Sequence, residues 1–416
     1  MRRLLPQTVR SIVIVAAPTL LAGCVALLSG CGKGGTETVP GGGPLRRLAP
    51  IAAQGAVSVT TRNTTRIGGA NTDVDAAAVA RVVYPGLTAG SQPEVVVLVD
   101  QRNWPAALSA SVLAGAPLHA PILYTEGSKL PSVSLEALEA MHPQGTASLG
   151  GAQVIEIGTH VPVPKRFSVD FLPVGDAATT SAAVERLMVS ARAGARPHQA
   201  IVLSVEGPRS LQMPAAGLAA ESAAPLVLLT GTRVPHAAAT ELRSLHHPSI
   251  YVMNAAHLSR AAFGELARLG RVTNIPSGST GEPAGPAANA ISVARFTDGT
   301  FGWGIKEPGH GLVFANAGRP LDAPAGALLS ATADYGPLLL LEASSRIPAP
   351  LAAYLGDIQP AYSTAPEFQP VRGVYNHGWL VGDERAITPV TQSELDSLLE
   401  ISPTRQAGEA SASQPE

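Results

Sequence analysis

The chain has 416 residues, of which 45% are hydrophobic and 14% are charged, and its formal net charge at pH 7 is −2. This length and hydrophobic content are typical of a globular chain of two to four domains. A nucleic-acid-binding protein would carry a strongly basic patch, so the charge balance argues against that class.

The N-terminus is typical of a bacterial lipoprotein signal, because three arginines precede an apolar run from Ile12 to Leu28. Small residues precede both cysteines of the chain, Cys24 and Cys31, as in a lipobox. We expect lipidation at Cys31, since the sequence that follows, GKGGTETVPGGG, suits a flexible tether. Cleavage before Cys24 would leave a second, free thiol in an oxidising compartment. Lipidation at Cys24 and an uncleaved membrane anchor remain the alternatives.

The first folded segment contains a strand–helix–strand pattern. Val95 to Val99 is a continuous apolar run, which predicts a strand buried on both faces of a parallel sheet. A helix is expected from Trp104 to Ala114, and a second buried strand from Pro121 to Thr125. Periodicity also predicts a preceding helix over Thr72–Val83 and a following helix over Ser134–Met141.

The strand–helix–strand pattern recurs at Ile201–Thr230 and again at Leu312–Leu341, with the first strands offset by 105 and 111 residues. A repeat of this length predicts three similar subdomains. The expected fold class is α/β, with three tandem Rossmann-like subdomains containing parallel sheets. The expected divisions are a signal peptide (1–30), a tether (31–62), subdomains 1 (63–172), 2 (173–272) and 3 (273–402), and a disordered tail (403–416). The strands expected at the centres of the sheets are Val95–Val99, Ile201–Val205 and Leu312–Ala315.

Four sequence segments resemble the cell wall binding repeat 2 family. They are RIGGANTDVDAAAVARVVYP (Arg66–Pro85), NWPAAL (Asn103–Leu108), PILYT (Pro121–Thr125) and WLVGDERAIT (Trp379–Thr388). The resemblance spans residues 63–401 and is weakest in the second repeat. It implies three tandem repeats that hold a surface protein non-covalently on the bacterial cell wall.

The family's helix start, an aromatic residue followed by Asp-Ala-Leu, is only partly kept. The first repeat has Trp104 but Ala106 at the acidic position, and the second repeat has Leu211 and Gln212. The third repeat keeps Asp322, preceded by Leu321. Any ligand contact that the family makes through this aspartate is therefore in doubt in two repeats.

No sequence motif predicts catalysis, a cofactor or a metal site. Residues 30–35 satisfy GxGxxG, but no helix follows them to receive a phosphate. Asp73 and Asp75 could form a carboxylate pair, or could complement a helix dipole. Trp303 could stack on a sugar, or could pack at a subdomain junction.

Ligands of parallel α/β units lie beyond the carboxyl ends of the strands. The candidate residues for polymer binding there are Arg102, Asn103, Trp104, Arg209, Arg319 and Asp322. An arginine in all three loops could face an anionic wall polymer through bidentate contacts. Alternatively, these arginines could close a subdomain interface with a carboxylate.

The expected function is that of a non-enzymatic, lipid-anchored envelope protein. Its partners would be a cell-wall polysaccharide or another anionic wall polymer, and the membrane through its lipid. It would lie on the outer face of the cytoplasmic membrane, facing the wall. A solute-binding lipoprotein of a transport system is the alternative and should have two similar halves and a hinge. An envelope scaffold protein is a further alternative, whereas an envelope hydrolase would need a catalytic domain for which the repeats leave no room.

Overall fold

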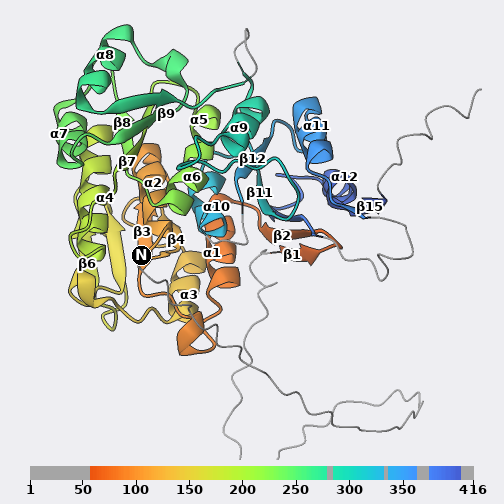
Figure 1. Ribbon diagram of the computed structural model, residues 1–416. Helices are drawn as coiled ribbons and strands as arrows, with labels where there is room; N and C mark the ends of the chain where they lie inside the picture. The colour runs from red at the N-terminus through yellow and green to blue at the C-terminus, as the bar shows by residue number, and fades with distance from the viewer. Residues whose placement is uncertain (1–56, 279–283, 332–335, 363–373, 404–416) are drawn as a thin grey trace, which may run out of the picture. The chain divides into compact units, whose positions relative to one another are not determined.

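The computed structural model describes residues 57–278, 284–331, 336–362 and 374–403 (Figure 1). The expected signal peptide, both cysteines, and almost all of the expected tether and tail lie outside the described residues. The described residues all belong to one compact unit. Among the described helices, none combines the length and the apolar character needed to span a bilayer.

Three separate sheets contain the central strands expected from the sequence. The first two are wholly parallel, and the third is parallel except for its outermost strand, β1. The first sheet has the order β4 (Ile122–Thr125), β3 (Val96–Asp100), β5 (Val154–Ile157), β6 (Val169–Leu172). The second has the order β10 (Arg271–Asn274), β9 (Ser249–Val252), β7 (Gln199–Ser204), β8 (Leu226–Leu229). The third has the order β1 (Val57–Thr60), β2 (Thr64–Gly68), β14 (His377–Val381), β11 (Gly311–Asn316), β12 (Leu338–Leu341). Because β3, β7 and β11 each have a neighbour on both sides, the expected α/β fold class is confirmed.

The helices fall mostly where periodicity predicted them. They are α1 (Thr72–Val83), α2 (Trp104–Ala110), α3 (Ser132–Met141), α4 (Ala177–Ala191), α5 (Arg209–Gln212), α6 (Pro214–Ser222), α7 (His236–Ser244), α8 (Arg260–Leu269), α9 (Pro286–Arg295), α10 (Asp322–Ser330), α11 (Ala349–Asp357) and α12 (Pro389–Leu399). A short two-stranded pair, β13 (Ala361–Tyr362) and β15 (Ser402–Pro403), accompanies them.

Helix α11 was not expected from the sequence, and two further helices differ from expectation for local reasons. The helix expected over Trp104–Ala114 is α-helical only to Ala110 and continues as the 3₁₀ helix η3 (Ser111–Ala114). Helix α8 was not expected from the sequence. It begins after Ser259, whose hydroxyl accepts a hydrogen bond from the N–H of Ala262 as an N-cap.

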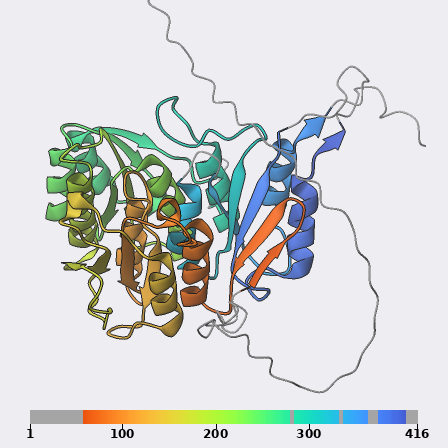
Figure 2. The same cartoon turned by 90° about the horizontal axis from the view of Figure 1, so that it is seen from below.

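In the structure, each repeat is counted from the strand that precedes its first helix, so β2, β6 and β10 begin the three repeats; this count differs by a few residues from the divisions expected from the sequence. Each of these strands joins the sheet of a different repeat. Strand β6 immediately precedes α4 of the second repeat but pairs with β5 of the first, and β10 precedes α9 of the third repeat but pairs with β9 of the second. Strand β2 of the first repeat pairs in parallel with β14 of the third. Figure 2 shows this orange strand beside the blue strands of the third sheet. The three repeats therefore form a closed ring of contacts.

The centre of this ring is built from helices of small residues. Helices α6 and α10 pack against each other and against η3, so all three repeats meet there. One hydrophobic core runs through the three subdomains, and a smaller core covers the outer face of each sheet. In β3 the side chains alternate, with Val97 and Val99 in the central core and Val96 and Leu98 in the outer one.

Glycine at position 217 sets the spacing between two of the central helices. A Cβ atom added to Gly217 of α6 would lie 2.9 Å from the Oγ atom of Ser330 in α10. We expect Gly217→Val to lower the free energy of unfolding by about 1–3 kcal/mol, because the extra methyl groups force the helices apart. Urea unfolding monitored by circular dichroism measures this change.

Gly264 of α8 provides the matched control, since a Cβ atom added there would meet nothing within 4 Å. Gly264→Ala should raise the free energy of unfolding by about 0.5–1 kcal/mol, as expected for a helix interior that gains alanine. Equal effects of the two substitutions would contradict the close helix packing described here.

Candidate functional site

The candidate residues lie in the three loops that follow β3, β7 and β11, at the carboxyl ends of the parallel strands. These loops lead directly into helices α2, α5 and α10. The carboxyl ends of parallel strands are where α/β proteins place ligands, so the three loops are the first place to seek a site. Their side chains nevertheless have three different environments.

The loops of the first and second repeats meet at Trp104. This side chain is buried, and its Nε1–H group donates a hydrogen bond of 2.7 Å to Oε1 of Gln212. The Gln212 amide in turn donates to the carbonyl oxygen of Gly207, at 2.7 Å. Trp104 therefore packs at the junction of two repeats. Asn103 accepts a hydrogen bond from the N–H of Ala106 and caps α2.

Two exposed arginines flank this tryptophan. The side chain of Arg102 is 70% exposed and forms a bidentate pair with Asp100, with Nε–Oδ1 and Nη2–Oδ2 distances of 3.1 and 2.7 Å. Hydrogen bonding to Arg102 lowers the pKa of Asp100 from its usual value. Arg209 is also exposed, and its guanidinium carbon lies 6.0 Å from the centre of the Trp104 ring. Within the described part of the chain, Arg209 forms no ion pair.

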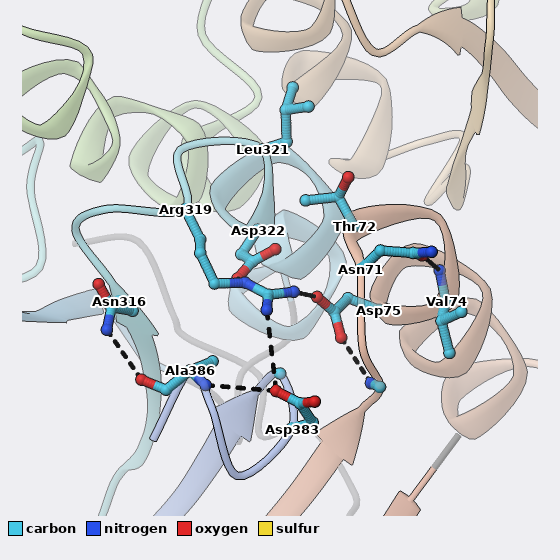
Figure 3. A network of polar contacts seen from close by, with 12 residues as sticks. Asn71, Thr72, Val74, Asp75, Asn316, Arg319, Leu321, Asp322, Asp383 and Ala386 are labelled. Atoms are coloured by element: carbon cyan, nitrogen blue, oxygen red, sulfur yellow. Dashed lines mark hydrogen bonds and ion pairs between the residues drawn. The ribbon is translucent and has the colours of Figure 1, made fainter. Parts of the chain in front are cut away.

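Arg319 in the third loop lies instead among three carboxylates (Figure 3). It forms an ion pair with Asp75 of α1, and its Nε atom lies 2.8 Å from Oδ2 of Asp322. Its Nη1 atom lies 3.9 Å from Oδ1 of Asp383. The side chains of Asp75 and Asp322 are 0% exposed and that of Arg319 is 20% exposed. Arg319 thus makes the contacts expected of an interface residue between the first and third repeats.

Burial dominates the ionisation of these carboxyl groups. Desolvation raises the pKa of Asp75 to about 6, although Arg319 and the N–H group of Gly69 both favour the ionised form. Desolvation also raises the pKa of Asp322 well above its usual value, and the charge of Asp75 adds to that shift. The guanidinium group of Arg319 therefore pairs with two buried carboxyl groups, those of Asp75 and Asp322.

The other two junctions use uncharged groups at the position of Asp75. Asp75 is the fourth residue of α1, and the fourth residue of α9 is Asn289. The amide of Asn289 donates to the carbonyl oxygen of Leu211 at 2.9 Å, and the amide of Asn254 donates to the same oxygen at 2.6 Å. The fourth residue of α4, Thr180, hydrogen-bonds within its own loop at Gly175. Among the described residues, the junction that closes the ring is the one with a charged group at this helix position.

Sequence reasoning named Arg319 and Asp322 but did not pair them with Asp75, which lies 244 residues from Arg319. The recurrence of a polar residue at the fourth helix position was the available signal. Trp303 is half-buried and packs between the central core and the outer core of the third repeat, as expected of a junction residue.

Two further features of the described residues bear on ligands. A cavity of about 640 Å³, open to solvent, lies between α9 and α11, and its two charged residues, Arg295 and Asp357, pair with each other. No group of three or more His, Cys, Asp or Glu side chains in the described ranges is arranged to hold a metal ion.

Comparison with solved structures identifies proteins of similar fold. Cwp6 from Clostridium difficile matches with a TM-score of 0.57 and 15% sequence identity, over 79% of this chain and 49% of that one. Cwp8 from Clostridium difficile matches with a TM-score of 0.57 and 14% identity, over 82% of this chain and 52% of that one. The chain spans about half the length of each neighbour. No family model and no curated protein sequence matches the chain. The likeness in fold is consistent with the resemblance seen in the sequence.

The contrast between the buried and the exposed arginine gives a direct prediction. Arg319→Met should lower the free energy of unfolding at pH 7 by about 3–5 kcal/mol, because it leaves two buried carboxyl groups without their cation. Arg102→Met is the control and should change stability little, since its pair with Asp100 is largely exposed. Urea unfolding of both variants measures the difference, and a small effect of Arg319→Met would contradict the buried network.

Proposed function

We propose that this chain is a non-enzymatic, lipid-anchored envelope protein that binds an anionic cell-wall polymer through its three repeats. The observation that carries the proposal is the likeness in fold, over about four fifths of the chain, to two cell wall proteins. The sequence segments that resemble the cell wall binding repeat 2 family support the same role.

The exposed loops suggest how the polymer is held. Arg102 lies in the loop before α2 and Arg209 at the start of α5, and both side chains are exposed near the junction that the buried Trp104 makes with Gln212. A guanidinium group makes bidentate contacts with phosphate or carboxylate, and several weak contacts on one rigid ring add up to firm attachment. Arg209 is the better placed of the two, because Arg102 must exchange its contact with Asp100 for the polymer. Arg319 contributes through the shape of the third loop, since its charge is already paired.

The ring architecture favours this role over solute binding. A solute-binding lipoprotein should have two similar lobes joined by a hinge. Here three sheets pack around one continuous core, and each repeat supplies a strand to another. Such an arrangement suits a rigid binding platform.

The polymer role makes a prediction about salt and charge. The double variant Arg102→Ala/Arg209→Ala should bind purified wall at least tenfold more weakly than the parent, and more weakly than either single variant. Binding by the parent should also weaken as salt is raised, because exposed charges are screened over about 8 Å at physiological ionic strength. A sedimentation assay with the unlipidated full-length chain measures both effects.

The matched control removes two exposed arginines, Arg243 and Arg268, which lie in the last turns of α7 and α8 and so at the opposite end of the second sheet from these loops. The variant Arg243→Ala/Arg268→Ala has the same net charge as the test variant and should bind wall like the parent. If the two double variants bind wall equally, polymer binding does not depend on Arg102 and Arg209. Absence of parent binding at low salt, or unchanged binding after the anionic polymer is extracted, would overturn the proposal.

The anchor is tested separately. Cys31→Ala should release the protein from membranes or block its processing, whereas Cys24→Ala should leave it membrane-bound. The physical reason is that two or more acyl chains are needed for stable membrane attachment, and the lipidated cysteine carries them. Membrane fractionation and mass spectrometry of the mature N-terminus provide the measurement. Lipid on Cys24 would move the site, and an intact Met1 would exclude the lipoprotein.

A further inference from the structure

The ring is closed by its N-terminal arm, which we define as β1, β2 and α1 (residues 57–83). Strand β2 pairs with β14, and α1 packs against α10, so the arm connects the first repeat to the third. Arg66 of this arm is buried and donates hydrogen bonds to the carbonyl oxygen of Asp383, at 2.7 Å, and to Oε1 of Gln392, at 3.0 Å. Unlike the lead-in strands β6 and β10, this arm joins a sheet that lies far from it in sequence.

A cluster of one cation and two buried carboxyl groups fastens the arm to the third repeat. We call Asp75, Arg319 and Asp322 the clasp. Arg319 provides one positive charge for two side chains that are 0% exposed. Oδ2 of Asp322 accepts a hydrogen bond from the Nε–H group of Arg319. The other oxygen, Oδ1, is buried and has no hydrogen-bond partner among the described residues.

Among the described residues, Arg319 is the cation that pairs with Asp75 and Asp322, while the exposed Arg385 lies beside Asp383, at 3.9 Å. From α1 the buried Asp73 adds a carboxyl group, and from the loop after β14 Asp383 adds another at 3.9 Å from Arg319. From β4 the buried Tyr124 donates its hydroxyl to the carbonyl oxygen of Leu321, at 2.6 Å. The neighbouring arginine, Arg66, is engaged with Gln392 and with backbone oxygens. A proton is therefore the simplest way to satisfy the second carboxyl group.

We infer that the ring closes with a proton bound at the clasp, carried by Asp322 and shared with Asp75, so that loss of this proton loosens the N-terminal arm. A protonated Oδ1 can donate to the Asp75 carboxylate, which gives the unpartnered atom a hydrogen bond. Asp75 then remains ionised against Arg319, and the clasp has no excess negative charge in its buried interior.

The direction of the pH effect follows from linkage. Both carboxyl groups have a higher pKa in the closed ring than an exposed aspartate has, so closure takes up a proton and opening releases it. The clasp stabilises the closed arm fully at pH values below the pKa of an exposed aspartate, near 4. This stabilisation decreases as pH rises toward the higher pKa that the carboxyl groups have in the closed state. Opening of the arm should increase by up to about tenfold per pH unit across that interval.

Hydrogen exchange of the full chain between pH 6 and pH 8 tests this inference, with rates corrected for the pH dependence of intrinsic exchange. In the parent, peptides from α1 and β2 should lose protection as pH rises, by up to about tenfold per unit. The variant Asp322→Asn replaces the protonated carboxyl with a neutral amide that can still donate. It should keep the arm protected and leave only the small pH dependence near pH 6 that Asp73 of α1 contributes, since burial raises the pKa of that carboxyl group to about 6. Asp75→Asn removes the ion pair that joins the arm to Arg319 and should lower protection of the arm at every pH in this range.

Glu185 supplies the matched control. It is buried in α4, pairs with Arg192 at 3.1 Å, and burial raises its pKa to about 7. Glu185→Gln should therefore change the pH dependence of protection in α4 and leave that of the arm unchanged. This inference concerns closure of the ring and does not depend on what the ring binds.

Two outcomes would overturn the inference. One is arm protection in the parent that does not change between pH 6 and pH 8. The other is a pH dependence of the arm that persists undiminished in Asp322→Asn, or that is removed equally by Glu185→Gln. Either result would mean that Asp322 does not take up a proton when the ring closes.

Discussion

The pairing of β2 with β14 is the contact on which the rest of the structure depends. The first and second sheets each receive their last parallel strand from the repeat that follows in the chain. In the third sheet this strand comes from the N-terminal arm. Without that pairing, β14 would be an open sheet edge and α10 would lose its packing against α1. Ring closure thus ties the loops of all three repeats to one rigid frame.

A second constraint is the space at the centre of the ring. Three helices can approach one another there only because alanine, glycine and serine occupy the facing positions, as Gly217 and Ser330 illustrate. Each sheet consequently has two buried faces, one toward the shared core and one toward its own outer core. The continuous apolar strands of the sequence are the direct consequence, since neither face meets water.

The sequence predicts the local elements well and the long-range pairings poorly. Continuous runs such as Val95–Val99 identify central strands, and the bounds of α1 follow from its periodicity and its Asn71 cap. Nothing local reveals that β2 belongs to the third sheet, or that Asp75 meets Arg319, because both contacts join residues more than 240 positions apart. Arg102, Arg209 and Arg319 look equivalent in the sequence but differ in exposure for the same reason, because residues of other repeats determine which of them is buried.

Each repeat of the sequence begins with a strand that pairs in the sheet of another repeat. This offset has a consequence for how such a protein can evolve. Each repeat contributes its first strand to the sheet of one neighbour, and its own sheet is completed by a strand from the other neighbour. One repeat alone would leave both its own sheet and its donated strand incomplete. An ancestor with a single repeat would therefore have been stable only as a cyclic assembly of three identical chains, each exchanging a strand with the next. The present protein holds three such units in one polypeptide, and the clasp lies where the first of them meets the third.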